Sequence, residues 1–212
     1  ALENDLKARE DKLRRREEAL EEWESSLKDT AIDGDHSPTA NSTTEDPESP
    51  EFIDLSRLGT GREVHADYAA PRDVSSADAP VDGIVEIYTD GACSGNPGPC
   101  GYGFVARKGD DYAEAYEFLG EGTNNIAELE AIRSAVQSLT DRQTPTRVYS
   151  DSRYAIGVLS KGWNAKANRE LILEARELLD EFSDLELRKV EGHAGHALNE
   201  RADDLAKKAV SS

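Results

Sequence analysis

After residue 82 the hydrophobic periodicity of the chain switches repeatedly between that of a strand and that of a helix. Apolar and polar residues alternate in 84–89 and 185–190, whereas apolar residues recur at helical spacing in 125–139 and 169–182. The predicted order is βββαβααβα, over 84–89, 102–107, 112–119, 125–139, 147–150, 153–159, 169–182, 185–190 and 199–210. Three consecutive strands followed by crossover helices require a mixed sheet. The sequence therefore predicts an α/β domain over 82–212, with a five-stranded mixed sheet flanked by helices.

The first 81 residues differ from this domain in composition. Residues 1–30 are dense in charge and lack Gly and Pro, so they are expected to form a helix. Its leucines recur every seven residues, at Leu6, Leu13, Leu20 and Leu27, but Arg9 and Arg16 fall on the other seam position. A solvated single helix and a coiled coil that mediates self-association both remain open.

Residues 31–81 are expected to form a disordered acidic linker. Residues 31–80 hold eleven acidic and three basic residues and five prolines, and they contain little apolar surface to offset the entropy of ordering. A short apolar patch at 52–55 could dock on another part of the protein. Because the predicted core lies beyond Asp82, the domain is expected to fold without residues 1–80.

The overall charge of the chain is unusual for a protein that binds nucleic acid. The net charge is −19 over 212 residues, whereas nucleic-acid-binding surfaces are usually basic. Either the chain binds no nucleic acid, or its surface is adapted to high salt, where screening weakens self-repulsion.

The chain has no long apolar run and its first residues lack the apolar core of a signal peptide, which predicts a cytoplasmic protein without a membrane span. In a reducing cytoplasm, free thiols are favoured for Cys93 and Cys100, but they flank a turn and the alternative of a disulfide across a hairpin stays open.

Four acidic residues stand at the ends of predicted strands or near the starts of predicted helices. Asp90 and Asp151 follow strands, and Glu128 and Asp203 lie early in helices. Such positions bring carboxylates from distant parts of a chain together, and converging carboxylates repel one another unless a cation binds between them. Hard oxygen ligands favour Mg²⁺ or Mn²⁺, and two such ions can stabilise both oxygens of a phosphodiester displacement.

The motifs around these acids occur as Tyr88-Thr89-Asp90-Gly91 through Gly98, Thr123-Asn124-Asn125-Ile126-Ala127-Glu128-Leu129, Tyr149-Ser150-Asp151-Ser152-Arg153-Tyr154, and Gly192-His193 through Asp203. Their residues, order and spacing closely resemble those of type I ribonuclease H over 84–210. The resemblance implies a ribonuclease H fold in which Asp90, Glu128, Asp151 and Asp203 hold metal ions. It also implies that His193 aids turnover from a flexible loop.

The same resemblance implies a set of substrate contacts. Seven positions match family contacts to a hybrid: Asn96, Thr123, Asn124, Asn125, Arg153, Tyr154 and Asn168. Asn199 matches a position near the second metal. Arg153 departs from relatives that carry an amide there. The basic protrusion of some relatives is reduced here to 161–169, which predicts weak affinity per domain.

These observations predict an endonuclease that hydrolyses the RNA strand of RNA/DNA hybrids with two Mg²⁺ ions, Mn²⁺ being possible, and that leaves 5′-phosphate and 3′-hydroxyl ends. The alternative is a catalytically weak hybrid-binding module on the same fold.

Overall fold

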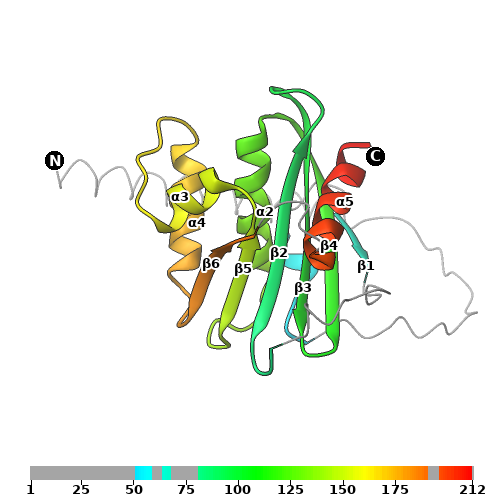
Figure 1. The fold of residues 1–212 in the computed structure, drawn as a ribbon, viewed down its shortest axis with the longest axis vertical. Coiled ribbons are helices and arrows are strands. Elements are labelled where there is room, and N and C mark those ends of the chain that lie inside the picture. Colours follow the sequence, from blue (N-terminus) through cyan, green and yellow to red (C-terminus); the bar gives the residue numbers. More distant parts are fainter. Residues whose placement is uncertain (1–50, 59–63, 68–80, 191–195, 212) are drawn as a thin grey trace, which may run out of the picture. The chain divides into compact units, whose positions relative to one another are not determined.

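The computed structural model describes residues 51–58, 64–67, 81–190 and 196–211. Within them, the chain folds into a six-stranded sheet of order β1-β4-β3-β2-β5-β6 (Figure 1). Its elements are η1 Leu55–Arg57, β1 Val64–Asp67, β2 Val85–Cys93, β3 Gly98–Lys108, β4 Asp111–Gly122, α2 Asn124–Ser138, β5 Thr146–Ser150, α3 Arg153–Ser160, α4 Arg169–Leu179, β6 Leu185–Lys189 and α5 Ala197–Ser211. No helix among the described residues is long and apolar enough to cross a membrane.

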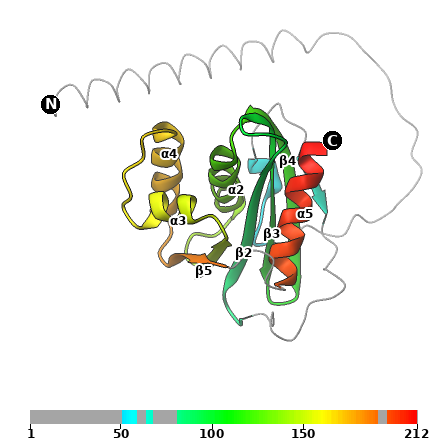
Figure 2. The ribbon, with the colours of Figure 1, turned by 45° about the horizontal axis from the view of Figure 1, so that its top comes forward.

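The pairing of the strands confirms the predicted mixed sheet. β2, β3 and β4 pair antiparallel in succession, whereas β5 pairs parallel with β2 and β6 pairs parallel with β5. The helices lie on both faces: α2, α3 and α4 cover one face and α5 covers the other (Figure 2). Each face has its own apolar core, the larger one built around Ile87, Phe104, Leu129 and Ile132, and the smaller around Tyr88, Val105 and Leu205.

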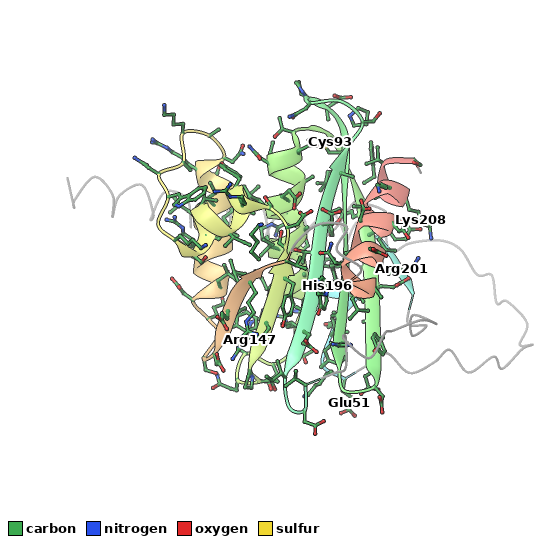
Figure 3. All side chains as sticks on the ribbon, viewed as in Figure 1. Glu51, Cys93, Arg147, His196, Arg201 and Lys208 are labelled. Carbon is green, nitrogen blue, oxygen red and sulfur yellow. A yellow bond between two sulfur atoms is a disulfide. The ribbon has the colours of Figure 1, made fainter. Side chains whose placement is uncertain are left out.

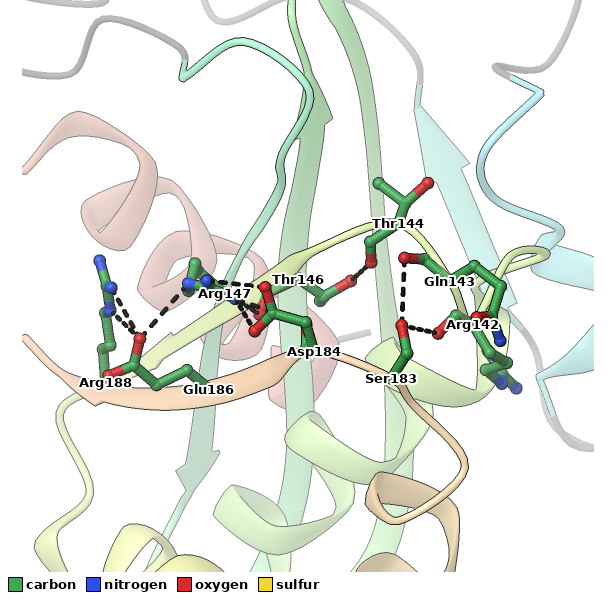
Figure 4. A network of polar contacts seen from close by, with 9 residues as sticks. All are labelled: Arg142, Gln143, Thr144, Thr146, Arg147, Ser183, Asp184, Glu186 and Arg188. Carbon is green, nitrogen blue, oxygen red and sulfur yellow. Dashed lines mark hydrogen bonds and ion pairs between the residues drawn. The ribbon is translucent and has the colours of Figure 1, made fainter.

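Ion pairs also connect the two parallel strands β5 and β6 at one edge of the sheet. Arg147 of β5 makes ion pairs with Asp184 and Glu186, and Glu186 also pairs with Arg188 of β6 (Figure 4). These side chains are partly exposed, so each pair contributes little by itself. The network runs between β5 and β6 near the strand starts and helps to hold β6 in register at the sheet edge.

The prediction that residues 31–81 form a disordered linker is wrong for 51–58 and 64–67. β1 adds a sixth strand, antiparallel to β4 at the sheet edge. Phe52, Ile53 and Leu58 are 7%, 3% and 4% exposed and belong to the larger core. Ile53 forms a β-bridge with Leu139, just after α2, so apolar burial and backbone pairing together offset the entropy of ordering this segment.

The prediction of free thiols is also wrong, because Cys93 and Cys100 form a disulfide. The two residues are direct partners in the β2–β3 register, where β2 runs four residues beyond its predicted end at Thr89. Cys93 lies at the turn end of this hairpin (Figure 3). The prediction of free thiols rested on the reducing state of the cytoplasm. The strand register instead places the two Cα atoms 4.0 Å apart, where a disulfide can form.

We expect the disulfide to stabilise the hairpin that carries Asp90. A Cys93→Ser/Cys100→Ser double variant should lose about 2 kcal/mol of unfolding free energy, because the bridge closes a short loop in the unfolded chain. Denaturant unfolding of both proteins, with and without a thiol reductant, measures this. Reductant should destabilise only the parent protein, and an equal response of both proteins would contradict the expectation.

Candidate active site

Asp90 lies on β2, in the centre of the sheet, and Gly91 explains why a helix can approach it. A Cβ atom at residue 91 would lie 2.4 Å from the backbone nitrogen of Glu128 and 2.4 Å from the carbonyl carbon of Ala127. Only a glycine therefore lets the first turns of α2 pack directly on β2. The Gly91 N–H also donates to Asp90 Oδ1 over 2.9 Å, which fixes the carboxylate near the helix.

Glu128 and Asp151 reach the same place from two other elements. Thr123 caps α2, its hydroxyl accepting from Ile126 N–H at 3.4 Å, so that Glu128 lies in the second turn. Asp151 directly follows β5, whose parallel pairing with β2 sets Ser150 beside Thr89. The Ser152 hydroxyl then accepts from Ala155 N–H and starts α3.

The three carboxylates form a compact cluster. One oxygen each from Asp90, Glu128 and Asp151 lies within 4.8 Å of the others, and all three residues are partly buried. Glu128 Oε2 is buried with no hydrogen-bond partner in the described structure. A buried carboxylate oxygen is costly to leave without a partner, and a divalent cation bound by all three groups would satisfy it.

Asp203 reaches Asp90 from the opposite face of the sheet, on α5. A Cβ atom at Gly103 of β3 would lie 2.5 to 2.7 Å from atoms of α5, so this glycine allows the helix to lie close to the sheet. Asp203 lies near enough to Asp90 to raise the pKa of that carboxyl, and it accepts a hydrogen bond from Lys207 Nζ at 2.5 Å. The structure thus brings together all four predicted acids, three as a tight cluster and one at its edge.

Burial and like charge disfavour ionisation in this cluster. Burial, followed by the charges of Asp151 and Asp203, raises the pKa of Asp90 from 3.8 to about 7, although the Gly91 N–H acts in the opposite direction. The pKa of Glu128 is raised well above 4.5, first by burial and then by the charges of Asp90 and Asp151. Groups held in this way release protons when a cation binds.

We therefore expect Mg²⁺ affinity to rise with pH. Because the folded pKa of Asp90 exceeds its unfolded value, the folded protein retains this proton up to about pH 7, and a cation must displace it below that pH. Mg²⁺ should bind about tenfold more tightly at pH 8 than at pH 6, as measured by calorimetry without substrate. By the same linkage, metal-free stability should fall as pH rises from about 4 to about 7. Equal affinity at both pH values would contradict this expectation.

The structure places the predicted substrate residues as follows. Asn96 lies in the exposed β2–β3 turn, and Thr123, Asn124 and Asn125 form the start of α2. Arg153 and Tyr154 begin α3, with Tyr154 packed partly on the larger core. Asn168 precedes α4 with a left-handed backbone (φ 58°) and makes no capping hydrogen bond through its side chain.

Two further predicted site residues, Asn199 and His193, belong to the C-terminal part of the domain. Asn199 lies in the first turn of α5, four residues before Asp203, and is 5% exposed with its Oδ1 lacking a hydrogen-bond partner in the described structure. His193 lies outside the described residues. Sequence reasoning missed Lys207, although its spacing of four residues from Asp203 on a predicted helix could have signalled the ion pair.

The fold and the acid cluster define a class of enzymes, and comparison with known proteins agrees. Residues 82–211 match the family model described as RNase H. The chain therefore belongs to the RNase H family and is an enzyme of the ribonuclease H class.

The similar proteins match about three fifths of this chain and nearly the whole of their own length. The chain is 39% identical over 140 residues to a ribonuclease H from Syntrophomonas wolfei, a match covering 59% of this chain and 95% of the relative. A ribonuclease H from Agrobacterium fabrum is 41% identical, with 59% and 94% coverage.

Solved structures show the same likeness. RNase H1 from the halophilic archaeon Halobacterium salinarum NRC-1 matches with a TM-score of 0.55 and 34% identity, covering 61% of this chain and 98% of that one. LC11-RNase H1, solved in complex with an RNA/DNA hybrid, matches with a TM-score of 0.53 and 28% identity, covering 60% and 96%.

Proposed function

We propose that this enzyme hydrolyses the RNA strand of RNA/DNA hybrids, using two Mg²⁺ ions, or Mn²⁺, held by Asp90, Glu128, Asp151 and Asp203. The observation that carries the proposal is the cluster of three carboxylate oxygens within 4.8 Å of one another, one of them buried without a partner. The crystallised complex of the similar LC11-RNase H1 with an RNA/DNA hybrid supports the choice of substrate.

In this proposal the acidic residues hold the metal ions that support hydrolysis. Bound divalent ions would activate water, and would neutralise charge on the phosphate and the leaving oxygen. The four carboxylates would hold them, with Asn199 beside Asp203 as a neutral oxygen donor. Water attacks phosphorus and the bond to the 3′-oxygen breaks, which leaves 3′-hydroxyl and 5′-phosphate ends. We include His193 in the proposal as a residue that aids product departure.

Substrate recognition is proposed for the same end of the sheet. The starts of α2 and α3 follow β4 and β5 directly, so Thr123, Asn124, Asn125 and Arg153 stand near the acids. Backbone N–H groups at helix starts favour phosphate, and amide side chains can read the 2′-hydroxyl that distinguishes RNA from DNA. Asn96, Tyr154 and Asn168 extend this proposed surface on the neighbouring turn and helices.

The test compares three substrates under matched conditions. The full chain is incubated with a labelled RNA/DNA hybrid, duplex DNA and duplex RNA, with Mg²⁺ or with a chelator. Cleavage of the hybrid alone, only with the metal and with 5′-phosphate products, is expected. Tight hybrid binding without cleavage would instead support the alternative, a catalytically weak binding module.

We further propose that residues 1–30 form a helix through which the chain self-associates on long hybrids, joined to the nuclease domain by an acidic linker. The heptad leucines support this, and linked copies raise the effective concentration at a second site. Light scattering on the full chain and on residues 51–212 measures self-association. A monomeric full chain would contradict it.

The net charge supports a salt-adapted enzyme. At −19, self-repulsion is expected to destabilise the metal-free fold in dilute buffer, and a Debye length of about 3 Å at 1 M salt screens it. The thermal midpoint should therefore rise with salt, whereas hybrid binding weakens through counterion release. Activity measured against salt should pass through an optimum, and a steady fall from low salt would oppose the proposal.

A further inference from the structure

Lys207 makes an ion pair with one of the four acids of the candidate active site. It follows Asp203 by one turn of α5, and its ammonium nitrogen lies 2.5 Å from Asp203 Oδ2. The carboxylates of Asp90 and Asp204 also attract this ammonium group. The Lys207 side chain is 59% exposed and Asp203 is 19% exposed, so the pair lies where the acid cluster meets solvent.

Asp203 differs from the other three acids because it is paired with Lys207. Asp90, Glu128 and Asp151 each direct an oxygen into one compact group, and Asp203 is not part of that group. Asp203 lies on the Asp90 side and has one oxygen engaged by the ammonium. A cation can therefore reach the group of three without disturbing Lys207, whereas a cation bound by Asp203 must compete with the ammonium for the same carboxylate.

We propose that Lys207 is a positioning residue, an internal counter-ion that neutralises Asp203 in the metal-free protein and makes divalent cations fill the position at Asp203 after the one at Asp90, Glu128 and Asp151. This inference rests on the proposed function, because it takes the four acids to be the metal ligands. Lys207 acts on the ions through Asp203 and need not touch substrate.

The energetics favour a counter-ion that can be displaced. Four converging carboxylates repel one another, and a nearby ammonium reduces that repulsion. An exposed ion pair is weak, so a divalent ion can replace it with little loss. The same positive charge repels an incoming Mg²⁺ ion, which lowers the affinity of the position at Asp203 relative to the other position.

The experiment compares Lys207→Gln with Lys208→Gln in the full chain. Both variants remove one positive charge from neighbouring residues of the same exposed helix surface. Lys208, however, lies over the Tyr116 ring, 4.4 Å from its centre. Lys207→Arg restores a cation. Each protein is treated with chelator and then titrated with Mg²⁺ alone, without substrate, by calorimetry and by the shift of its thermal unfolding midpoint.

We expect Lys207→Gln to lower the metal-free unfolding midpoint in dilute buffer and to tighten the weaker Mg²⁺ binding step about two- to fivefold, the range that an exposed ion pair allows. Lys207→Arg and Lys208→Gln should bind Mg²⁺ like the parent protein, and 1 M salt should reduce the difference. The Mg²⁺ concentration for half-maximal cleavage should fall in parallel for Lys207→Gln.

Three results would overturn the inference, and they are distinguishable. Unchanged or weaker Mg²⁺ binding by Lys207→Gln shows that Lys207 does not compete with the ion. An equal shift in Lys208→Gln shows a general effect of charge rather than a local contact. Failure of the parent protein itself to bind Mg²⁺ shows that the proposed metal site is wrong, and the inference falls with it.

Discussion

An Asp90→Asn variant should lose hybrid cleavage by more than about 100-fold and yet be more stable than the parent protein when metal is absent. Substitution of residues that only support a metal ligand already costs about 10- to 100-fold, and Asp90 is a proposed ligand itself. The amide keeps the shape of the side chain but removes a charge that is partly buried and faces Asp151 and Asp203.

The stability gain should depend on pH in a defined direction. Above about pH 7 the parent protein carries an ionised Asp90 that burial and neighbouring charges oppose, so Asn should add about 1–3 kcal/mol at pH 8. Near pH 5 Asp90 retains its proton in the folded state, and most of the advantage should disappear. Chelator-treated proteins unfolded in denaturant at both pH values provide the measurement.

Asp204→Asn is the matched control for this experiment. It removes one negative charge from the residue next to Asp203, on the exposed side of α5. Neither cleavage nor stability should change much, since surface substitutions usually stay within about 0.5 kcal/mol. Near-parental cleavage by Asp90→Asn with Mg²⁺ would show that Asp90 is not a required ligand.

Removal of residues 1–58 should destabilise the domain severely, whereas removal of residues 1–50 should not. Phe52, Ile53 and Leu58 are buried in the larger core, and each such side chain contributes about 1.5–3 kcal/mol by burial. Their sum is comparable to the total stability of many domains. Sequence alone predicted that the domain folds without residues 1–80, and from this burial we instead expect a boundary near residue 51.

Backbone contacts in the same segment add to this effect. Asp54 N–H donates to Ser138 C=O at 2.7 Å, Thr140 N–H donates to Phe52 C=O at 3.2 Å, and the Arg57 guanidinium donates to Leu139 C=O. Two of these bonds are accepted by the Ser138 and Leu139 carbonyl groups at the end of α2, and the third is donated by the Thr140 N–H. A truncated protein would lose all three bonds.

Thermal and denaturant unfolding of residues 51–212 and 59–212 measure the difference. In the full chain, Ile53→Ala should cost about 2–4 kcal/mol, because it leaves a cavity in a packed core. Glu51→Ala is the control, since Glu51 is exposed and its backbone carbonyl, which accepts from Thr140, is unchanged. Equal stability of the two truncated proteins would show that the segment is dispensable.

Much of the fold and of the site follows from local patterns. The predicted elements correspond to every described strand and helix after residue 82. Where alternation or helical spacing was clear, it reflects the side-chain directions of strands and helices. The four acids were found because each stands near the end of such an element within a motif. The ends of the elements were predicted less accurately. For example, β2 continues through Asp90 to Cys93, because β3 pairs with it that far.

Other features depend on residues that are distant in the sequence. Composition alone predicted disorder around Phe52 and Ile53, because their burial requires the surface beside Leu139 that only the folded domain provides. The pairing of Cys93 with Cys100 depends on strand register, and the roles of Gly91 and Gly103 depend on how closely α2 and α5 approach the sheet. Local sequence patterns thus identified the elements after residue 82 and the acids that they carry. Packing between distant segments explains why three of the acids share one site, why Lys207 pairs with the fourth, and why residues before 82 contribute to the core. No local pattern carries this information.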